Sequence, residues 1–410
     1  MKKVIIILTL ILNLNFVYAN EVGNANKNTV LYNLNDNKII YEENGDDKVA
    51  IASLTKIMTT LIAIENIKNI DEEVTITNEA FKNTTGYTKA GFKVGDKVTY
   101  KDLLYGIMLP SGADAVNATI INVTNDKSKY VDLMNNKAKE LNLNNTHFDN
   151  AVGMDTEDEN GNIVKDFSSY KDSGNYSTAN DMATLLKYAL ENQTFKEIFE
   201  AREYIVPSTK LKLNSTLKTY SKNTDLNIEN IKGAKSGFTD GAGYCLASTA
   251  EINDVNYLLI VLGSNTTYKS NAIKDTVTIY DYYSKNYSYQ KISTKGDTLH
   301  KIKIKLGKKE YYDVKVKDDI TLYLKNDIDK TKIKYEYEGI NELNYKIKKN
   351  TKLGTITIKY EDEELYKQDI YLDEDIKYYH PLIYSTILIG VISLLTIKIK
   401  LKRKKRKRKK

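Results

Sequence analysis

The sequence predicts an α/β domain, followed by a small all-β domain and a C-terminal transmembrane helix. Three observations predict this order. Strand-like segments at both ends of residues 20–288 enclose a helical middle, which is typical of one sheet built from both ends of a domain. Residues 289–376 alternate between apolar and polar side chains, as half-exposed strands do. An almost wholly apolar run at 382–397, which snorkelling of Lys398 and Lys400 extends to a span of 382–401, then precedes a basic end.

Residues 1–19 have the pattern of a secretory signal peptide. Two lysines precede an apolar run, and Val17-Tyr18-Ala19 fits a small-residue cleavage site. We therefore expect the mature chain to lie outside the cytoplasm. The single cysteine, Cys245, cannot form an intramolecular disulfide, and its apolar neighbours predict a buried, inert thiol.

Hydrophobic periodicity divides the first domain, residues 20–288, into expected elements. Apolar residues recur at helical spacing or in short strand-like runs, with glycines and polar clusters between them. A stretch rich in glycine and acidic residues at 149–175 is typical of a long mobile loop. The expected helices are 54–66, 101–109, 114–123, 129–141 and 179–191, and the expected strands are 29–34, 39–42, 242–249 and 256–262.

The second domain, residues 289–376, is expected to be a small all-β module. Its tyrosines and lysines fit either glycan binding or packed rings with lysines that protect sheet edges. We expect it to act as a spacer that lifts the first domain off a membrane. Its expected strands are 302–306, 311–316, 355–360 and 366–371.

The C-terminal end predicts a single-pass membrane anchor. Eleven Lys and Arg residues lie between Lys398 and Lys410, so the positive-inside rule makes residues 402–410 a basic cytoplasmic tail. The tail either contacts anionic lipid headgroups or serves only as an orientation signal. Without the tail and the signal peptide, the formal net charge changes from +7 to mildly negative. Nucleic acid is therefore not an expected partner.

A Ser-x-x-Lys pair at the head of an apolar helix is the first candidate for chemistry. Lys56 would lie one helical turn from Ser53 on the same face, where a lysine can act as the base for a serine nucleophile. None of the three histidines lies beside a serine in a nucleophile motif. The alternative is that Ser53 caps a helix and Lys56 is solvated. The same spacing also occurs, without an apolar helix, at Ser168/Lys171, Ser215/Lys218 and Ser288/Lys291.

Two further segments supply hydroxyl groups and a lysine. Ser111 has Asp114 three residues on, which by itself also fits helix capping. Lys235-Ser236-Gly237 precedes a pair of strands. A lysine and a hydroxyl there can hold a substrate carboxylate, and the glycine lets a peptide backbone approach the strand edge. The structural alternative is an edge-strand lysine followed by a β-bulge.

Together and in this order, the segments match the Ser-x-x-Lys, Ser-x-Asn and Lys-Thr-Gly set of penicillin-recognising serine enzymes. Residues 52–59, 145–148, 176–183 and 240–245 resemble the low-molecular-weight penicillin-binding proteins that are D-alanyl-D-alanine carboxypeptidases. The segment from Lys295 is similar to the C-terminal domain of that family. The resemblance covers nearly the whole ectodomain. It implies a transpeptidase/β-lactamase-like fold with an antiparallel sheet flanked by helices, in which His147 is structural.

The resemblance implies a role for each motif residue. Ser53 would be the acylated nucleophile, Lys56 the neutral amine that takes its proton, and Ser111 the relay to the leaving D-alanine. Burial and a nearby lysine charge must lower the pKa of Lys56 for that role. Backbone N–H groups of Ser53 and Phe238 would form the oxyanion hole. Substrate binding would involve Lys235, Ser236, Gly237 and Phe238.

Two positions depart from the family pattern. Ser236 replaces a threonine and keeps the hydroxyl, whereas Ala113 replaces the asparagine whose amide would hold the substrate. Asn117, one helical turn further on, is a candidate substitute, although it would lie about 6 Å along the helix axis. The alternative is that the site works without an amide here and Asn117 is a solvated helix residue.

The resemblance also implies a substrate and an inhibitor class. The protein would remove the terminal D-alanine from peptidoglycan pentapeptide stems, would be acylated by β-lactams, and would need no metal or cofactor. Its ectodomain would face the cell wall. Two alternatives are a β-lactamase, for which Glu157-Asp158-Glu159-Asn160 offers a Glu-x-x-Asn string, and a catalytically weak wall-binding relative, which Ala113 would favour.

Overall fold

The structure, a computed structural model, describes residues 28–155, 174–378 and 381–407. The chain divides into two compact units, residues 1–284 and 285–410, where the sequence analysis placed the division at 288/289. The expected signal peptide and the Glu-x-x-Asn string lie outside the described residues, as does most of the expected loop at 149–175.

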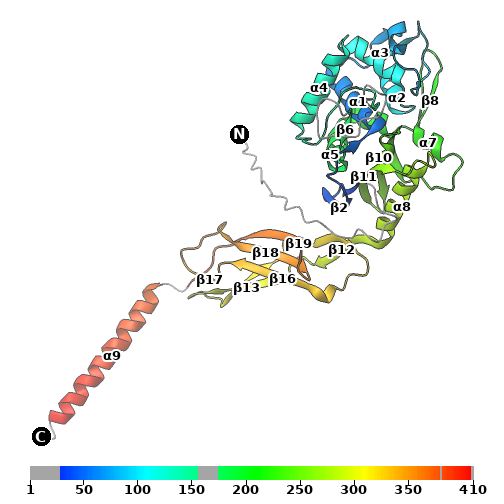
Figure 1. Cartoon of the computed structure of the whole chain (residues 1–410). Helices are drawn as coiled ribbons and strands as arrows, with labels where there is room; N and C mark the ends of the chain where they lie inside the picture. The colour runs from blue at the N-terminus through cyan, green and yellow to red at the C-terminus, as the bar shows by residue number, and fades with distance from the viewer. Residues whose placement is uncertain (1–27, 156–173, 379–380, 408–410) are drawn as a thin grey trace. The chain divides into compact units, whose positions relative to one another are not determined.

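A five-stranded antiparallel sheet is the frame of the first unit (Figure 1). Its strand order, β2-β1-β11-β10-β9, brings the two ends of the unit into one sheet, which confirms the predicted α/β domain. The edge strand β9 was not among the expected strands. The bounds are β1 (Asn28–Asn33), β2 (Lys38–Glu43), β9 (Ile231–Thr239), β10 (Gly243–Ile252) and β11 (Val255–Ser264).

Helices cover both faces of this sheet. Neighbouring residues of a strand point to opposite faces. Leu258 and Ile260 of β11 therefore join the core formed with α1 and α5, while Tyr257 contacts Tyr280 of α8 on the other face. Helix α1 is buried on all sides over its first nine residues, although the sequence predicted one buried face. The bounds of these helices are α1 (Thr55–Asn66), α5 (Ala179–Ala189) and α8 (Asn271–Asn286).

The thiol of Cys245 on β10 is buried, as predicted, and burial raises its pKa to about 12.

Shorter elements complete the first unit. The remaining helices are α2 (Tyr100–Met108), α3 (Ala113–Val123), α4 (Lys127–Glu140), α6 (Gln193–Glu200) and α7 (Thr216–Ser221), with 3₁₀ turns η1 (Ala52–Leu54) and η2 (Asn78–Phe81). Short strand pairs are β3 (Val49–Ala50) with β6 (Tyr176–Ser177), β4 (Glu73–Thr75) with β5 (Lys97–Thr99), and β7 (Glu203–Ile205) with β8 (Lys212–Asn214).

The second unit contains small sheets packed around their own core, which confirms the predicted all-β module. Alternate residues such as Ile302, Val314 and Ile356 are buried, and their neighbours along each strand are exposed or half-buried. The sheets have the orders β12-β15, β14-β13-β17 and β16-β18-β19. The bounds are β12 (Tyr287–Ser293), β13 (Thr298–Ile304), β14 (Tyr311–Lys315), β15 (Ile320–Lys325), β16 (Ile333–Gly339), β17 (Glu342–Leu343), β18 (Lys352–Tyr360) and β19 (Glu363–Tyr371).

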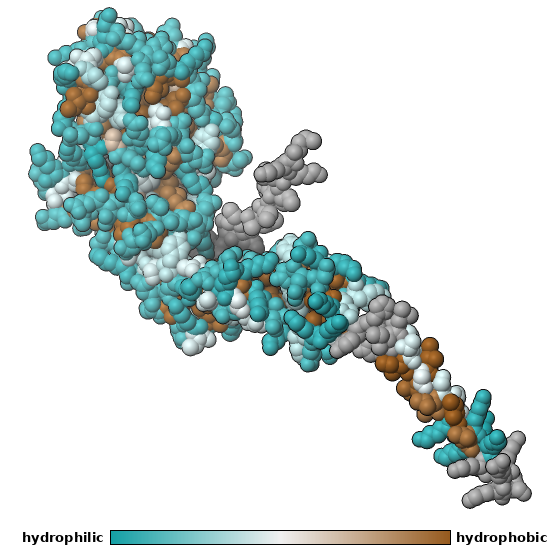
Figure 2. Space-filling model, turned by 180° about the vertical axis from the view of Figure 1, so that it is seen from behind, coloured by the Kyte–Doolittle hydropathy of each residue, from teal (hydrophilic) through white to brown (hydrophobic). Residues whose placement is uncertain are grey.

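Helix α9 (Pro381–Lys407) contains the segment 382–401 that the sequence assigned to a membrane span. Within the described ranges, no helix is both long enough and apolar enough to cross a membrane. The apolar stretch of α9 runs without a break into Lys398, Lys400 and Lys402. Figure 2 shows apolar side chains on the surface of the helix, and Ile389 and Leu394 are among the exposed ones.

Candidate active site

Ser53 and Lys56 form a hydrogen-bonded pair at the start of α1. Lys56 Nζ lies 2.9 Å from Ser53 Oγ and 2.5 Å from the carbonyl oxygen of Val152. Lys56 is 1% exposed. Ser53 lies in η1, and the residue that caps α1 is Leu54, without a side-chain cap. The alternative of a capping serine beside a solvated lysine is therefore wrong.

Burial makes the amine of Lys56 a possible base at neutral pH. The pKa of Lys56 is lowered to about 7, and the cause is the loss of water around the charged form. Near pH 7 about half of the Lys56 side chains are therefore neutral and can accept a proton.

Ser111 and Lys235 form a second pair. Lys235 Nζ donates to Ser111 Oγ at 2.9 Å and to the carbonyl oxygen of Ser236 at 2.6 Å. Although β9 is an edge strand, Lys235 is fully buried, so it is not the exposed edge lysine of the structural alternative. Burial, and next the charge of Lys56, lowers the pKa of Lys235 well below its usual range. Ser111 does not cap α3, because Gly112 occupies that position without a side-chain cap.

The backbone adopts a left-handed conformation at Ser111 and at the residue before Ser53. Ser111 itself has φ of 65°, and Ala52, next to Ser53, has φ of 45°. Both values lie in the left-handed region that residues with a Cβ rarely adopt. Such strain persists only where the surrounding structure imposes it, and it is typical of functional sites.

Gly237 brings strand β9 against the nucleophile. A Cβ at Gly237 would stand 2.8 Å from the backbone nitrogen of Ser53 and 3.0 Å from Ala52 Cβ, so only a glycine allows this approach. Beside it, Ser236 Oγ donates to Thr216 Oγ1 at 2.7 Å. The half-exposed ring of Phe238 stacks on Tyr244, with centroids 4.3 Å apart. The structure thus brings the two serine–lysine pairs to the same edge of the sheet.

Asn117 does not provide a free amide. Its Nδ2 donates to the carbonyl oxygens of Ala80 and Lys82, each at 3.1 Å, so both amide hydrogens hold the η2 segment. Asn117 is also only 2% exposed, which makes the alternative of a solvated helix residue wrong. Ala113, at the start of α3, is fully buried and has no polar side-chain atom to offer.

The other described Ser-x-x-Lys pairs are structural. Ser215 caps α7 by accepting from the N–H of Leu217, and Lys218 pairs with Glu203. Ser288 lies in the second unit, where its hydroxyl donates to Asn326 Oδ1. Ser168 lies outside the described residues.

A turn at residues 149–155 completes the site, and the sequence analysis did not identify it. Its contributions are the Val152 carbonyl beside Lys56 and the carboxylate of Asp155, which accepts from Thr239 Oγ1 at 2.7 Å and from Gly241 N at 2.9 Å. The signal in the sequence is Gly153, whose φ is 84° and where a Cβ would lie 2.1 Å from Ala52 O. A cavity of about 430 Å³ adjoins this turn and is lined by residues of α3, α4 and the turn itself, Val152 among them.

Comparisons with known proteins agree on one family. Residues 17–266 match the D-alanyl-D-alanine carboxypeptidase family, Peptidase S11, and residues 287–378 match the C-terminal domain of penicillin-binding protein 5. A D-alanyl-D-alanine carboxypeptidase of Bacillus subtilis is 28% identical over 367 residues, which cover 88% of each chain. One from Escherichia coli is 31% identical over 246 residues, 58% of this chain and 56% of that protein. The crystal structure of a Francisella tularensis D-alanyl-D-alanine carboxypeptidase shares the fold, with a TM-score of 0.66 at 22% identity over 89% of this chain and 97% of that one.

Proposed function

Since the chain belongs to the D-alanyl-D-alanine carboxypeptidase family, we propose that it removes the terminal D-alanine of peptidoglycan pentapeptide stems through an acyl-enzyme on Ser53. The observation that carries this mechanism is the 2.9 Å contact between Ser53 Oγ and Lys56 Nζ. A serine hydroxyl is a weak nucleophile until a base takes its proton. The buried amine of Lys56 is such a base, because its pKa is lowered to about 7.

Acylation moves the Ser53 hydroxyl proton and replaces a peptide bond of the substrate with an ester bond to Ser53. The Ser53 hydroxyl proton passes to Lys56 Nζ while Oγ bonds to the carbonyl carbon of the penultimate D-alanine. The backbone N–H groups of Ser53 and Phe238 donate to the negative oxygen that develops. The peptide bond to the terminal D-alanine then breaks, the proton held by Lys56 passes through Ser111 to the leaving nitrogen, and D-alanine leaves while Lys56 becomes neutral again. A water molecule then hydrolyses the ester. It gives one proton to Lys56 as its oxygen bonds to the acyl carbon, and Lys56 returns that proton to Ser53 Oγ as the ester bond breaks.

Lys235 supports binding of the terminal carboxylate, together with Ser236. Without a substrate, the pKa of Lys235 is lowered well below its usual range, by burial and then by the charge of Lys56. An arriving carboxylate favours the protonated form of Lys235. A positive charge on Lys235 in turn disfavours protonation of Lys56. Substrate binding therefore promotes the neutral amine that the first step needs.

Release of D-alanine from an acyl-D-alanyl-D-alanine peptide, followed beside labelled penicillin, tests the proposed function. We expect prompt release of D-alanine and a penicillin adduct that decays slowly. Rapid penicillin hydrolysis without D-alanine release would instead indicate a β-lactamase. If neither reaction occurs, the chain is a wall-binding relative, and Ala113 would be the first residue to examine.

We also propose that the enzyme works outside the cytoplasm and attaches to a lipid surface through α9. Exposed apolar residues such as Ile389 and Leu394, followed by consecutive basic residues, support attachment to anionic lipid.

Truncation before Pro381 should release the protein from the membrane fraction while D-alanine release from small peptides is retained. The physical reason is that the truncation removes the exposed apolar surface and the basic residues but no group of the proposed mechanism. Carbonate and salt washes of the full chain distinguish an inserted helix from a surface-bound one. A truncated protein that stays in the washed membrane fraction would overturn attachment through α9.

A further inference from the structure

We propose that Asn150 is a positioning residue for Lys56, because its side chain fixes the backbone carbonyl that binds the lysine amine. The inference rests on the proposed role of Lys56 as the base. That carbonyl belongs to Val152, two residues beyond Asn150, and accepts from Lys56 Nζ at 2.5 Å.

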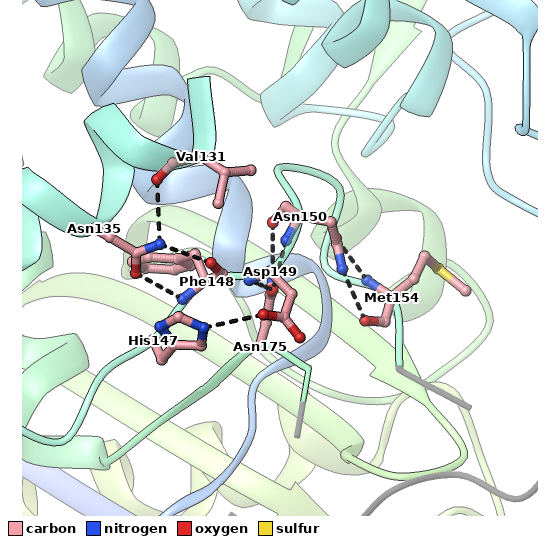
Figure 3. Close-up of polar contacts among 8 residues, drawn as sticks. All are labelled: Val131, Asn135, His147, Phe148, Asp149, Asn150, Met154 and Asn175. Carbon is pink, nitrogen blue, oxygen red and sulfur yellow. Dashed lines mark hydrogen bonds and ion pairs between the residues drawn. The ribbon is translucent and has the colours of Figure 1, made fainter. Parts of the chain in front are cut away.

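The Asn150 side chain organises the turn that carries the carbonyl, and Figure 3 shows its hydrogen bonds to the backbone of Met154. Its Oδ1 accepts from three successive N–H groups, those of Val152, Gly153 and Met154, at 3.2, 2.7 and 3.2 Å. Its Nδ2 donates to the carbonyl oxygen of Met154 at 3.2 Å. One side chain therefore sets the direction of the peptide groups on both sides of Val152.

Helix α1 holds the same turn at three consecutive carbonyls, the first through Asn175 and the other two directly. The Asn150 carbonyl accepts from Asn175 Nδ2, which also donates to Thr55 Oγ1, both at 2.8 Å. The Ala151 carbonyl accepts from Thr59 Oγ1 at 2.7 Å. The third carbonyl is that of Val152 on Lys56 Nζ. Asn175 is buried, and its Oδ1 accepts from the N–H groups of Asp149 and Asn150. The turn and the helix thus form one hydrogen-bonded body.

The position of this carbonyl matters for proton transfer. A neutral amine has one lone pair and two N–H bonds, and the lone pair must point at Ser53 Oγ to take its proton. A carbonyl that accepts one N–H fixes rotation about the last bond of Lys56 and directs the lone pair. In the described residues, Lys56 Nζ has hydrogen bonds to Ser53 Oγ and Val152 O. Because the Val152 carbonyl is the backbone acceptor of the Lys56 amine, orientation of the amine depends on it.

Asn135 provides a matched control in the same region of Figure 3. Its Oδ1 accepts from the N–H of Phe148 at 3.0 Å, and its Nδ2 donates to the carbonyls of Phe148 and Val131 at 2.8 and 3.2 Å. It is likewise a partly buried asparagine that binds backbone. It anchors the segment before the turn, and within the described residues its side chain hydrogen-bonds to the backbone of Val131 and Phe148 rather than to the peptide groups around Val152.

The experiment measures penicillin acylation of Asn150→Ala and Asn135→Ala by rapid mixing, over a range of penicillin concentrations. For Asn150→Ala we expect the limiting acylation rate to fall about tenfold to a hundredfold, because displacement of a catalytic group by about 1 Å has an effect of that size. The half-saturating concentration should stay unchanged. For Asn135→Ala the limiting rate should stay within about twofold of wild type, although both variants lose comparable hydrogen bonds and unfold at lower temperature.

Equal limiting rates in the two variants would overturn the inference, and so would a change confined to the half-saturating concentration. If an alanine variant does not fold, Asn150→Ser and Asn135→Ser decide in the same way. A serine hydroxyl accepts backbone N–H groups more weakly, so an intermediate rate is expected for Asn150→Ser alone.

Lys56→Met is measured in parallel. If it acylates like wild type, the proposed base is wrong. If it is slow while Asn150→Ala matches Asn135→Ala, only this inference is wrong.

Discussion

Ser53→Ala is expected to abolish covalent labelling by penicillin while the protein stays folded. The substitution removes the hydroxyl that lies 2.9 Å from Lys56 Nζ, and with it the atom that would form the acyl ester. Little stability should be lost, because Ser53 is only partly buried and does not cap α1. Labelled penicillin followed on a denaturing gel measures the adduct, and thermal unfolding of the same sample reports the fold.

Ser215→Ala is the matched control for this prediction. Ser215 has the same Ser-x-x-Lys spacing, but its hydroxyl caps α7. Its variant should label fully and lose about 1 kcal/mol of stability, the usual effect of removing a helix cap. Persistent labelling of a folded Ser53→Ala protein would contradict the assignment, and Ser168 and Ser288 would then be the serines to test.

The sequence predicted the frame of the fold because apolar periodicity marks buried strands and helices, but it missed several elements of the first unit, among them strand β9 and helix α8. Strand β9 contains Lys235, Ser236 and two glycines, a composition that argues against a strand. Those residues are there because the strand borders the active site. Helix α8 buries Tyr280 and Tyr283 on its sheet-facing side, and tyrosines on both faces weaken the helical pattern.

The chemical groups of the site were predictable, whereas their supports were not. Ser53 in the turn η1 and Lys56 in the first turn of α1 are three residues apart, so helical spacing was enough to place them together. Asn117 shows the limit of this reasoning. Its place on α3 was foreseen, but its two hydrogen bonds to the η2 segment depend on tertiary packing. The same holds for Asn150, whose role depends on a turn that no periodicity marks.

Lys56→Met is expected to lower the limiting acylation rate about a hundredfold to ten-thousandfold, the usual effect of losing general-base assistance. Methionine fills a similar volume without placing a charge in the interior, so the variant should fold. Lys218→Met is the control, since Lys218 occupies the same position in the Ser215 motif but pairs with Glu203 at the surface. Its acylation rate should match that of wild type.

The dependence of acylation on pH distinguishes a lost base from a disturbed fold. Burial lowers the pKa of Lys56 to about 7, so the neutral amine is present above that pH and is lost as the pH falls through it. The second-order rate constant for acylation of wild type, measured at low penicillin concentration, reports the free enzyme and should therefore rise with pH to a plateau, with a midpoint near 7. Lys56→Met should lack this step, because the group that titrates is gone, whereas a variant that is merely less stable would keep the midpoint at a lower amplitude.

A wild-type rate that is flat between about pH 5 and pH 9 would contradict Lys56 as the base. The same step in Lys56→Met would assign the titration to another group, with Lys235 the first to examine because it is the other buried lysine of the site.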